Sequence, residues 1–334
     1  MGVKKNTTLE LFKLIASYMV VFIHVVFRGN TGIVMDVLAR FAVPLFFLTS
    51  GFFSYQITLP KIKERIKHIS KLIITATACC IVFGISEFIL NGDTGGILPY
   101  LLEILHPVMI LRLIVFNKPV SSGHLWYLWA MLYVYIIFYF VTKRKTEENK
   151  IFRISVFLLA LHILLGEGLS VFGVTVPVMV IRNFALMGFP LFALGMFVRK
   201  NSNKICRVSD KVLIPAVLIG IALSVGSRYL FGKNELYTGT LLVLFAAVVA
   251  FLKHPNPNAF NFMTRLDGYS TYIYIFHIMV SSAVIRLYEA FHIGYVASTN
   301  LHPLFTCVAS TALAFVIVQT KSAIKKNKVK SVLQ

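Results

Sequence analysis

The sequence has few charged residues, and those it has are unbalanced in sign. Only 14% of the 334 residues are charged, 57% are hydrophobic and the mean hydropathy is +0.79. This composition excludes a soluble globular protein and predicts a membrane protein. The 33 Lys and Arg against 13 Asp and Glu give a formal net charge of +20. In a soluble protein this excess would suggest nucleic-acid binding, but here the basic residues lie between apolar runs, where membrane topology explains them.

Cysteine is also scarce, and its positions exclude a disulfide framework or a C-x-x-C metal site. Cys79 and Cys80 are adjacent in an apolar run, and the other two cysteines are far apart in the sequence. There is no internal repeat, low-complexity segment or long polar stretch. The apolar run after Lys4 contains Lys13 and His24, so we expect a retained helix rather than a removable signal. We therefore expect one membrane-embedded domain, 1–334, ending in a basic cytoplasmic tail, 321–334.

Apolar runs long enough to cross a bilayer, about 20 residues each, occur eleven times. The candidates are 9–27, 34–56, 70–90, 98–116, 124–142, 152–171, 174–198, 211–230, 236–253, 269–290 and 301–320. The fourth differs from the rest because Pro99 and Pro107 interrupt it and it contains Glu103, His106 and Arg112.

The distribution of Lys and Arg decides how many of these runs cross. If 98–116 does not cross, 24 basic residues fall on one side, and only Arg28, Arg112, Lys118 and Lys233 lie in loops on the other. If it does cross, two strongly basic loops, 143–153 and 199–211, would face outward. The positive-inside rule therefore favours an all-helical protein with ten transmembrane helices and both termini in the cytoplasm. Segment 98–116 is then an amphipathic or re-entrant element.

The first predicted helix carries a polar stripe. Glu10, Lys13, Ser17 and His24 follow one another at spacings of three, four and seven, which places them on one face. Lys13 and His24 are separated by roughly 16 Å along the helix axis. Each buried charge costs on the order of 2–3 kcal/mol in a membrane, so such residues need partners or water. Snorkelling to the interface explains single residues near helix ends, but not an aligned set.

The helix predicted over 269–290 repeats this pattern. Ser270, Tyr274, His277 and Ser281 lie on one face, so His277 is expected to point into the bundle. In the predicted topology, other polar and aromatic side chains lie in the outer half: Arg40, His124, Trp126 and Arg182. These residues are consistent with a polar cavity open to the exterior, although aromatic residues at a membrane interface are also typical in themselves.

A basic face is predicted at the start of the third span. Lys61, Arg65, His68 and, less closely, Lys71 follow helical spacing. The positive-inside rule alone explains such residues. Alternatively, this cationic face binds phosphates through charge-assisted hydrogen bonds.

Four motifs together resemble the acyltransferase 3 family of integral-membrane bacterial envelope O-acyltransferases, over residues 7 to about 320. The first is Glu10 and Lys13 with His24 eleven positions after Lys13. The others are RFAVPLFFLTSGF at 40–52, HLWYL at 124–128 and STYIYIFH at 270–277. Two departures are Lys13, where arginine is commoner in the family, and His68, where the family has a second arginine. The accessory soluble domain of some relatives is not expected here.

The resemblance implies transfer of an acyl group, taken here as acetyl, from cytoplasmic acyl-CoA to a hydroxyl of an extracytoplasmic envelope polysaccharide or lipid-linked sugar. His24 is the implied general base or transient acyl carrier, and the residues do not distinguish these roles. Lys13 is expected to assist catalysis and to contact the CoA phosphates, and Arg40 or Arg182 to stabilise the oxyanion. The expected CoA phosphate contacts are Lys61, Arg65, His68 and Lys71. The expected substrate contacts are Glu10, Ser17, Ser50, His124, Trp126, Tyr274 and His277.

Transport is the competing interpretation, because polar residues at membrane depth also line substrate pathways. The sequence lacks the matched pair of Gly- or Pro-broken helices typical of inverted-repeat carriers. It also lacks close metal-ligand spacing such as H-E-x-x-H, so no metal is predicted. The expected partners are acyl-CoA, the glycan acceptor and membrane lipids, without nucleic acid.

Overall fold

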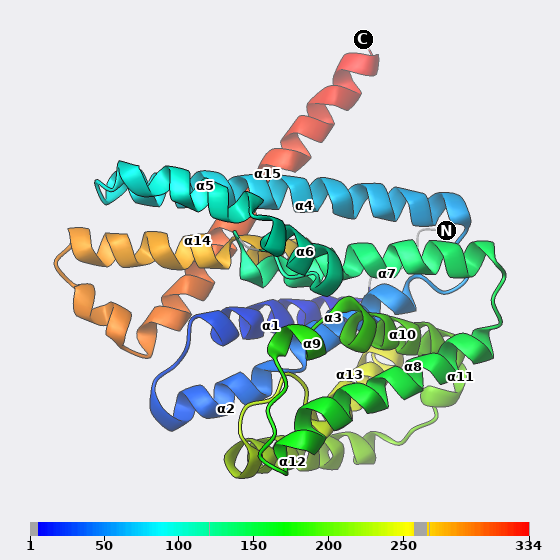
Figure 1. Cartoon of the computed structure of the whole chain (residues 1–334). Helices are drawn as coiled ribbons and strands as arrows, with labels where there is room; N and C mark the ends of the chain where they lie inside the picture. The colour runs from blue at the N-terminus through cyan, green and yellow to red at the C-terminus, as the bar shows by residue number, and fades with distance from the viewer. Residues whose placement is uncertain (1–5, 120, 257–265, 267, 334) are drawn as a thin grey trace. The chain divides into compact units, whose positions relative to one another are not determined.

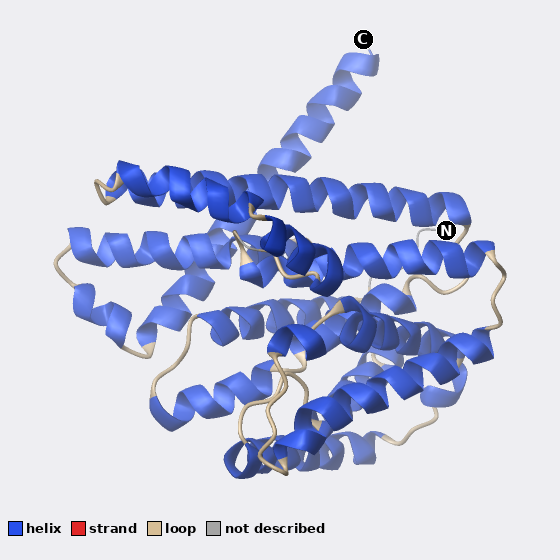
Figure 2. Ribbon diagram, in the orientation of Figure 1, coloured by secondary structure: helices blue, strands red, loops and turns tan. Residues whose placement is uncertain are grey.

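The protein is described here by a computed structural model of residues 6–119, 121–256, 266 and 268–333, and every regular element among them is helical (Figures 1 and 2). The predicted all-helical fold class is therefore confirmed for this part of the chain. Lys4, Lys5 and Arg265, which were counted as cytoplasmic charges, lie outside the described residues. The α-helices are α1 (Thr7–His24), α2 (Gly29–Ala39), α3 (Ala42–Phe52), α4 (Leu59–Leu90), α5 (Ile97–Leu105), α6 (Pro107–Phe116), α7 (Trp126–Lys143), α8 (Glu148–Ile163), α9 (Val178–Ile181), α10 (Phe189–Lys200), α11 (Ser202–Ile205), α12 (Leu213–Phe231), α13 (Thr238–Lys253), α14 (Tyr269–Ala290) and α15 (Leu301–Leu333).

Eight segments of the described chain are long and apolar enough to cross a membrane. They correspond to eight of the ten predicted spans: Thr7–His24, Gly29–Phe52, Leu59–Leu90, Gly123–Lys143, Glu148–Gly168, Asp210–Phe231, Tyr269–Ala290 and Leu301–Ile324. The span predicted over 236–253 is α13, an apolar helix of 16 residues. Helix α15 continues through Lys321 to Leu333, and the cytoplasmic tail over 321–334 stays a prediction.

The segment predicted to be amphipathic or re-entrant is broken at its centre. Helices α5 and α6 meet at His106 with a bend of 48°. Pro107 begins α6, where its missing N–H costs no helical hydrogen bond. The predicted interruption is thus confirmed at Pro107, whereas Pro99 lies in the first turn of α5 and does not break it. Whether the pair crosses the membrane stays a prediction.

The span predicted over 174–198 is not one continuous helix, which corrects the sequence analysis. Asn183 separates α9 from the helical turn that leads into α10. Its Oδ1 accepts hydrogen bonds from the backbone N–H groups of Ala185 and Leu186, both at 2.9 Å. Its Nδ2 donates to the Val180 carbonyl at 2.6 Å. One amide side chain therefore satisfies backbone groups on both sides of the break, which hydropathy does not reveal.

The helices form two compact units. Unit 1 comprises Met1–Ala42, Val208–Val225 and Gly239–Gln334, and unit 2 comprises Val43–Arg207 and Gly226–Thr238. Each unit is discontinuous in sequence and is described by itself below. The expectation of a single domain stays a prediction.

The centre of unit 1 is formed by α1, α14 and α15, which pack against one another (Figure 1). Leu14 and Val21 of α1, Tyr269 and Ile273 of α14 and Ala314 of α15 form a buried apolar cluster. The Tyr18 hydroxyl also lies 2.8 Å from the Thr311 hydroxyl. These contacts fix the rotation of α1, and with it the direction of its polar stripe.

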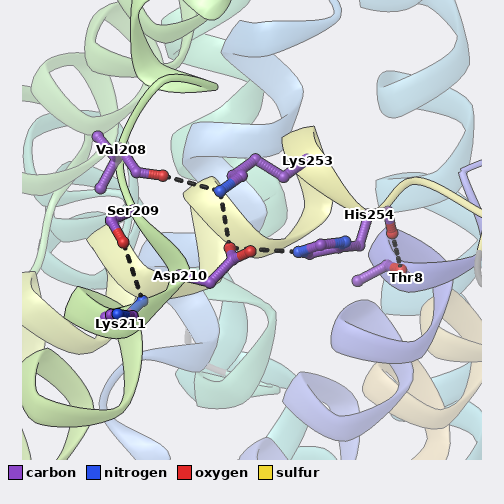
Figure 3. Close-up of polar contacts among 7 residues, drawn as sticks. All are labelled: Thr8, Val208, Ser209, Asp210, Lys211, Lys253 and His254. Atoms are coloured by element: carbon purple, nitrogen blue, oxygen red, sulfur yellow. Dashed lines mark hydrogen bonds and ion pairs between the residues drawn. The ribbon is translucent and has the colours of Figure 1, made fainter.

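The start of α1 is held by the end of α13 and the segment before α12 (Figure 3). Asn6 caps α1 by accepting from the Leu9 N–H at 2.9 Å, and its amide donates to the Phe251 carbonyl at 2.8 Å. The Thr8 hydroxyl donates to the His254 carbonyl. Asp210 lies 2.9 Å from the Lys253 ammonium and 3.3 Å from the His254 imidazole. This network positions the first turn of α1, where Glu10 and Lys13 follow.

Unit 2 is built on two pairs of packed helices, α4 with α7 and α8 with α10 (Figure 1). Helix α3 approaches α10 at two glycines. A Cβ on Gly51 would overlap the Phe192 carbonyl, and a Cβ on Gly195 would overlap the Leu48 carbonyl. Small residues of this kind let two helix backbones come close together in membrane proteins.

Candidate active site

Two histidines from distant parts of the sequence meet in unit 1. His24 is the last residue of α1, and His277 lies on α14. Their ring centroids are 5.2 Å apart, with the planes tilted by 44°. His277 is fully buried, so the prediction that it points into the bundle is confirmed, whereas His24 is exposed at the end of its helix. The structure thus joins the first-helix and late-helix motifs through their imidazoles.

The hydrogen bond of His277 fixes which ring nitrogen is basic. Its Nδ1 lies 2.8 Å from the Tyr274 carbonyl oxygen. Because a carbonyl can only accept, Nδ1 carries the proton, and in the neutral ring Nε2 is the accepting nitrogen. Tyr274 itself is buried, and its ring centroid lies 6.4 Å from that of His277. Helix α14 therefore presents a proton-accepting imidazole beside His24.

The cationic end of the first-helix stripe forms an ion pair. The Lys13 ammonium lies 2.7 Å from a Glu10 carboxylate oxygen, with side-chain exposures of 25% and 13%. Ser17 is buried and donates to the Leu14 carbonyl at 2.7 Å. Glu10 therefore partly neutralises Lys13, and the partial exposure of Lys13 leaves room for a second anionic partner.

A third polar stripe, which the sequence analysis missed, lies on α15. His302, Thr306 and Ser310 are buried at intervals of four residues. The His302 Nε2 lies 3.0 Å from the Ser281 hydroxyl, so it connects this stripe with that of α14. The four-residue spacing of polar residues in an apolar run was the available signal.

Arg40 is buried in unit 1, where it pairs with a residue one turn earlier. Its guanidinium lies 2.7 Å from the Asp36 carboxylate. The i, i+4 spacing of this pair was readable in the sequence but was not used. Arg40 is thus held in place with its charge compensated, and its predicted oxyanion role stays a prediction.

In unit 2, Arg65 contacts three neighbouring groups. Its guanidinium donates to the Ser54 hydroxyl at 2.7 Å, to the Phe53 carbonyl at 2.9 Å and to the Tyr135 hydroxyl at 3.3 Å. The guanidinium also lies 5.9 Å from the centroid of the Tyr135 ring. Arg65 therefore fastens α4 to the end of α3 and to α7, in addition to any role toward a ligand.

Replacing Arg65 with alanine is expected to destabilise the ligand-free protein by about 2 kcal/mol, because charge-assisted hydrogen bonds to a buried hydroxyl and a carbonyl are lost. Thermal unfolding in nanodiscs without ligand measures this effect. His68→Ala is the matched control, since His68 is exposed one turn further along α4. Equal unfolding temperatures for both variants would contradict the fastening role.

The other predicted CoA contacts remain exposed on α4. Lys61, His68 and Lys71 flank the face that buries Ile62 and Ile69. The 32 residues of α4 extend about 48 Å, against a hydrocarbon core of about 30 Å. The helix is therefore longer than a span requires, and its basic first third is expected at the membrane surface.

At the start of α7, Arg182 lies over Trp126. The guanidinium carbon is 5.3 Å from the ring centroid, which is a cation–π contact. Arg182 also forms an ion pair of 3.6 Å with Glu235. His124 and Trp126 are both buried, and Trp126 is 7% exposed. Little of its ring is therefore open to a sugar, and its predicted acceptor contact stays a prediction.

Sequence reasoning also missed the residues that hold this region together. Glu235 pairs with Arg182 from 53 positions away, a contact for which the sequence carries no signal. Asn117 is fully buried with φ of 47°. Its Oδ1 accepts from the Phe184 N–H at 2.8 Å, and its Nδ2 donates to the Trp126 carbonyl at 3.3 Å.

Ser50 lies on α3, within the Ser-Gly-Phe part of the second motif. Its carbonyl accepts from the Ser54 hydroxyl at 2.6 Å, and its side chain is hydrogen-bonded with the Tyr127 hydroxyl. The adjacent Gly51 makes the close approach to α10. Ser50 and Gly51 of the motif therefore both contribute to helix packing. Substrate binding by Ser50 stays a prediction.

The start of α8 and the end of α10 line a hollow in unit 2, and its walls include Tyr55, Phe152, Phe197 and Lys200. Lys200 lies 2.5 Å from Glu148. That hydrogen bond raises the pKa of the exposed Lys200 ammonium. Within the described residues, no group of three or more His, Cys, Asp or Glu side chains is arranged to hold a metal ion.

Together, these features define a polytopic helical membrane protein with a buried ion pair between Arg40 and Asp36 and with the exposed His24 beside the buried His277. The family model for the acyltransferase domain of the acyltransferase 3 family matches residues 6–319. The chain therefore belongs to this family, as the motifs indicated, and is an acyltransferase by membership. No curated protein and no solved structure matches the chain significantly.

Proposed function

We propose that the protein transfers an acetyl group from acetyl-CoA to a hydroxyl of a cell-envelope glycan or glycolipid on the opposite side of the cytoplasmic membrane. The observation that carries this proposal is the pairing of His24 with His277 in unit 1. Acyl transfer to a hydroxyl needs a group that removes its proton, and imidazole does so near neutral pH. Family membership supplies the reaction class.

The reaction begins when the acceptor hydroxyl attacks the thioester carbonyl. A C–O bond forms, the C–S bond breaks, and the hydroxyl proton passes to His24 and then to the departing CoA thiolate. Alternatively, the His24 imidazole attacks first and carries the acyl group to the acceptor. In either route a neutral His24 is required. The neighbouring His277, with Nε2 as its accepting nitrogen, accommodates the proton or orients the His24 ring.

The CoA phosphates are assigned to cations near the cytoplasmic ends of the helices. Lys61, His68 and Lys71 are exposed on the part of α4 that extends beyond the hydrocarbon core. Lys13 is partly exposed beside Glu10, and a phosphate near it adds a second negative partner. Arg65 contributes chiefly by positioning α4. Arg40 and Arg182 are the candidates for stabilising the oxyanion, and each already has a carboxylate that balances its charge.

Acetyl-CoA is expected to raise the unfolding temperature of the protein in nanodiscs, because a ligand that binds only the folded state stabilises it. At 100 times the dissociation constant the gain is about 2.7 kcal/mol. CoA lacking the acetyl group should give most of this gain, since the phosphates supply the contacts. The double variant Lys61→Gln and Lys71→Gln should reduce this rise in unfolding temperature. Lys143→Gln, which removes a charge at the end of α7, is the control.

Two results would contradict the proposed function. One is the absence of any acetyl-CoA-dependent shift. The other is uptake of a labelled solute by proteoliposomes without acetylation of envelope glycans, which would assign the protein to transport.

A further inference from the structure

A hollow in unit 2 lies where α7 begins. Its walls come from the end of α6, the first turn of α7 and the segment around α9, and they include Asn117, Lys118, Trp126, Met179 and Arg182. The residues that line it include two cations, and the Glu235 carboxylate, 3.6 Å from Arg182, is not among them. Lys118 has no role in the proposed reaction as described so far, and Arg182 appears there only as a candidate for stabilising the oxyanion.

Membrane topology does not explain the cation at Lys118. The positive-inside rule accounts for the 24 basic residues on the predicted cytoplasmic side, whereas Lys118 is one of four in the loops opposite. Its side chain is exposed and lines a hollow that the Arg182 guanidinium also lines. A cation that topology disfavours, placed beside a second cation, indicates an anionic ligand.

Arg182 is oriented for such a ligand. The Trp126 ring lies 5.3 Å from the guanidinium and holds its plane, while Glu235 lies 3.6 Å away, farther than a hydrogen bond. The planar fork of an arginine can therefore still donate to a phosphate or carboxylate. The Asn117 hydrogen bonds to Trp126 and Phe184 join three segments of the wall, so the hollow is preformed.

We propose that this hollow binds the anionic group, a phosphate or carboxylate, of a saccharide acceptor, with Lys118 and Arg182 as its two cationic contacts. The inference rests on the proposed function, since the hollow faces the predicted acceptor side. It adds that the acceptor is a charged sugar rather than a neutral one. Trp126 acts as a positioning residue for Arg182.

The two tryptophans of the chain allow a direct test. Trp129→Phe leaves Trp126 as the only indole, and the Trp129 N–H has no hydrogen-bond partner among the described residues, so little is lost. In phosphatidylcholine nanodiscs, glucose 1-phosphate and galacturonate are expected to change Trp126 emission saturably. Glucose should bind at least about tenfold more weakly, since one charge-assisted contact contributes about this factor.

Lys118→Gln in the Trp129→Phe background is expected to weaken binding of glucose 1-phosphate about tenfold. Lys143→Gln is the matched control, because it removes the same charge from the opposite end of α7, about 25 Å away along the helix. Its affinity should not change. Equal binding of glucose and glucose 1-phosphate, or equal affinities in the two variants, would overturn the proposal.

A lipid phosphate shares this chemistry, and a second arm separates the two sources. If phosphatidylglycerol in the nanodisc changes Trp126 emission and the sugar anions do not, the hollow binds a lipid headgroup and the proposal is overturned. Acetylation is assayed separately. Anion-selective binding without acyl transfer would support this site and contradict the proposed function, whereas acyl transfer without anion selectivity would overturn only the present inference.

Discussion

Replacing His24 with alanine is expected to lower the rate of acyl transfer by about a hundredfold to ten-thousandfold, the range that one acid–base group supplies. His24 lies at the end of α1 with its ring 5.2 Å from that of His277, so its removal takes away the exposed member of the pair. The affinity for acetyl-CoA should stay the same, because His24 is not a proposed phosphate contact, and Lys13, the proposed contact on the same helix, lies roughly 16 Å away along its axis. Turnover by His24→Ala protein in nanodiscs, with envelope extract as acceptor, measures the loss.

The control for this prediction is His106→Asn. His106 is an exposed histidine at the bend between α5 and α6, where its ring accepts from the Val108 N–H, and asparagine can replace that cap. Its activity should be that of the unmodified protein. If His24→Ala retains full activity, His24 is not a catalytic residue and the proposed mechanism fails.

The same variant distinguishes the two roles left open for His24. An acyl carrier would hold labelled acetyl on the protein when acetyl-CoA is supplied without acceptor, and His24→Ala would lose the label. A general base would show no labelled protein in either case. Rapid quenching followed by mass spectrometry of the peptide that contains His24 separates these outcomes.

Local sequence patterns predicted much of this site, because helical periodicity determines which residues share a face. The spacing of three placed Glu10 and Lys13 together, and the structure forms that ion pair at 2.7 Å. The period of α14 likewise predicted the burial of His277. The contact between His24 and His277 spans more than 250 positions, so only the packing of α1 against α14 reveals it.

The sequence could not reveal where side chains override a hydropathy pattern. The run over 174–198 is apolar enough to suggest one helix. The Asn183 side-chain amide, however, forms hydrogen bonds with backbone groups before and after Asn183, and the helix breaks there. Arg65 shows a related limit, because its spacing indicates a cationic face and gives no information on Ser54 or Tyr135. Both outcomes depend on individual hydrogen bonds, which composition does not encode.

The second motif gains a physical explanation from the contact between α3 and α10. Gly51 faces the Phe192 carbonyl, and Gly195 faces the Leu48 carbonyl, so each helix contributes one glycine to a reciprocal approach. Any side chain at either position would meet a backbone oxygen, which cannot rotate away as a flexible side chain can. The overlap with that oxygen can then be removed only if the whole helix moves, and close-packed interiors resist such movements.

Replacing Gly51 with alanine is accordingly expected to destabilise the protein by about 3 kcal/mol, the upper end of the usual cost of overpacking. Gly195→Ala should have a similar effect, and the double variant should cost less than the sum, because one separation of α3 from α10 relieves both overlaps. Thermal unfolding in nanodiscs, together with the yield of folded protein, measures these changes. Gly226→Ala is the control, since a Cβ there meets nothing within 4 Å and alanine favours the helix. If Gly51→Ala is as stable as Gly226→Ala, the two backbones do not approach as described, and the motif must then be explained by a direct contact of Ser50 with substrate.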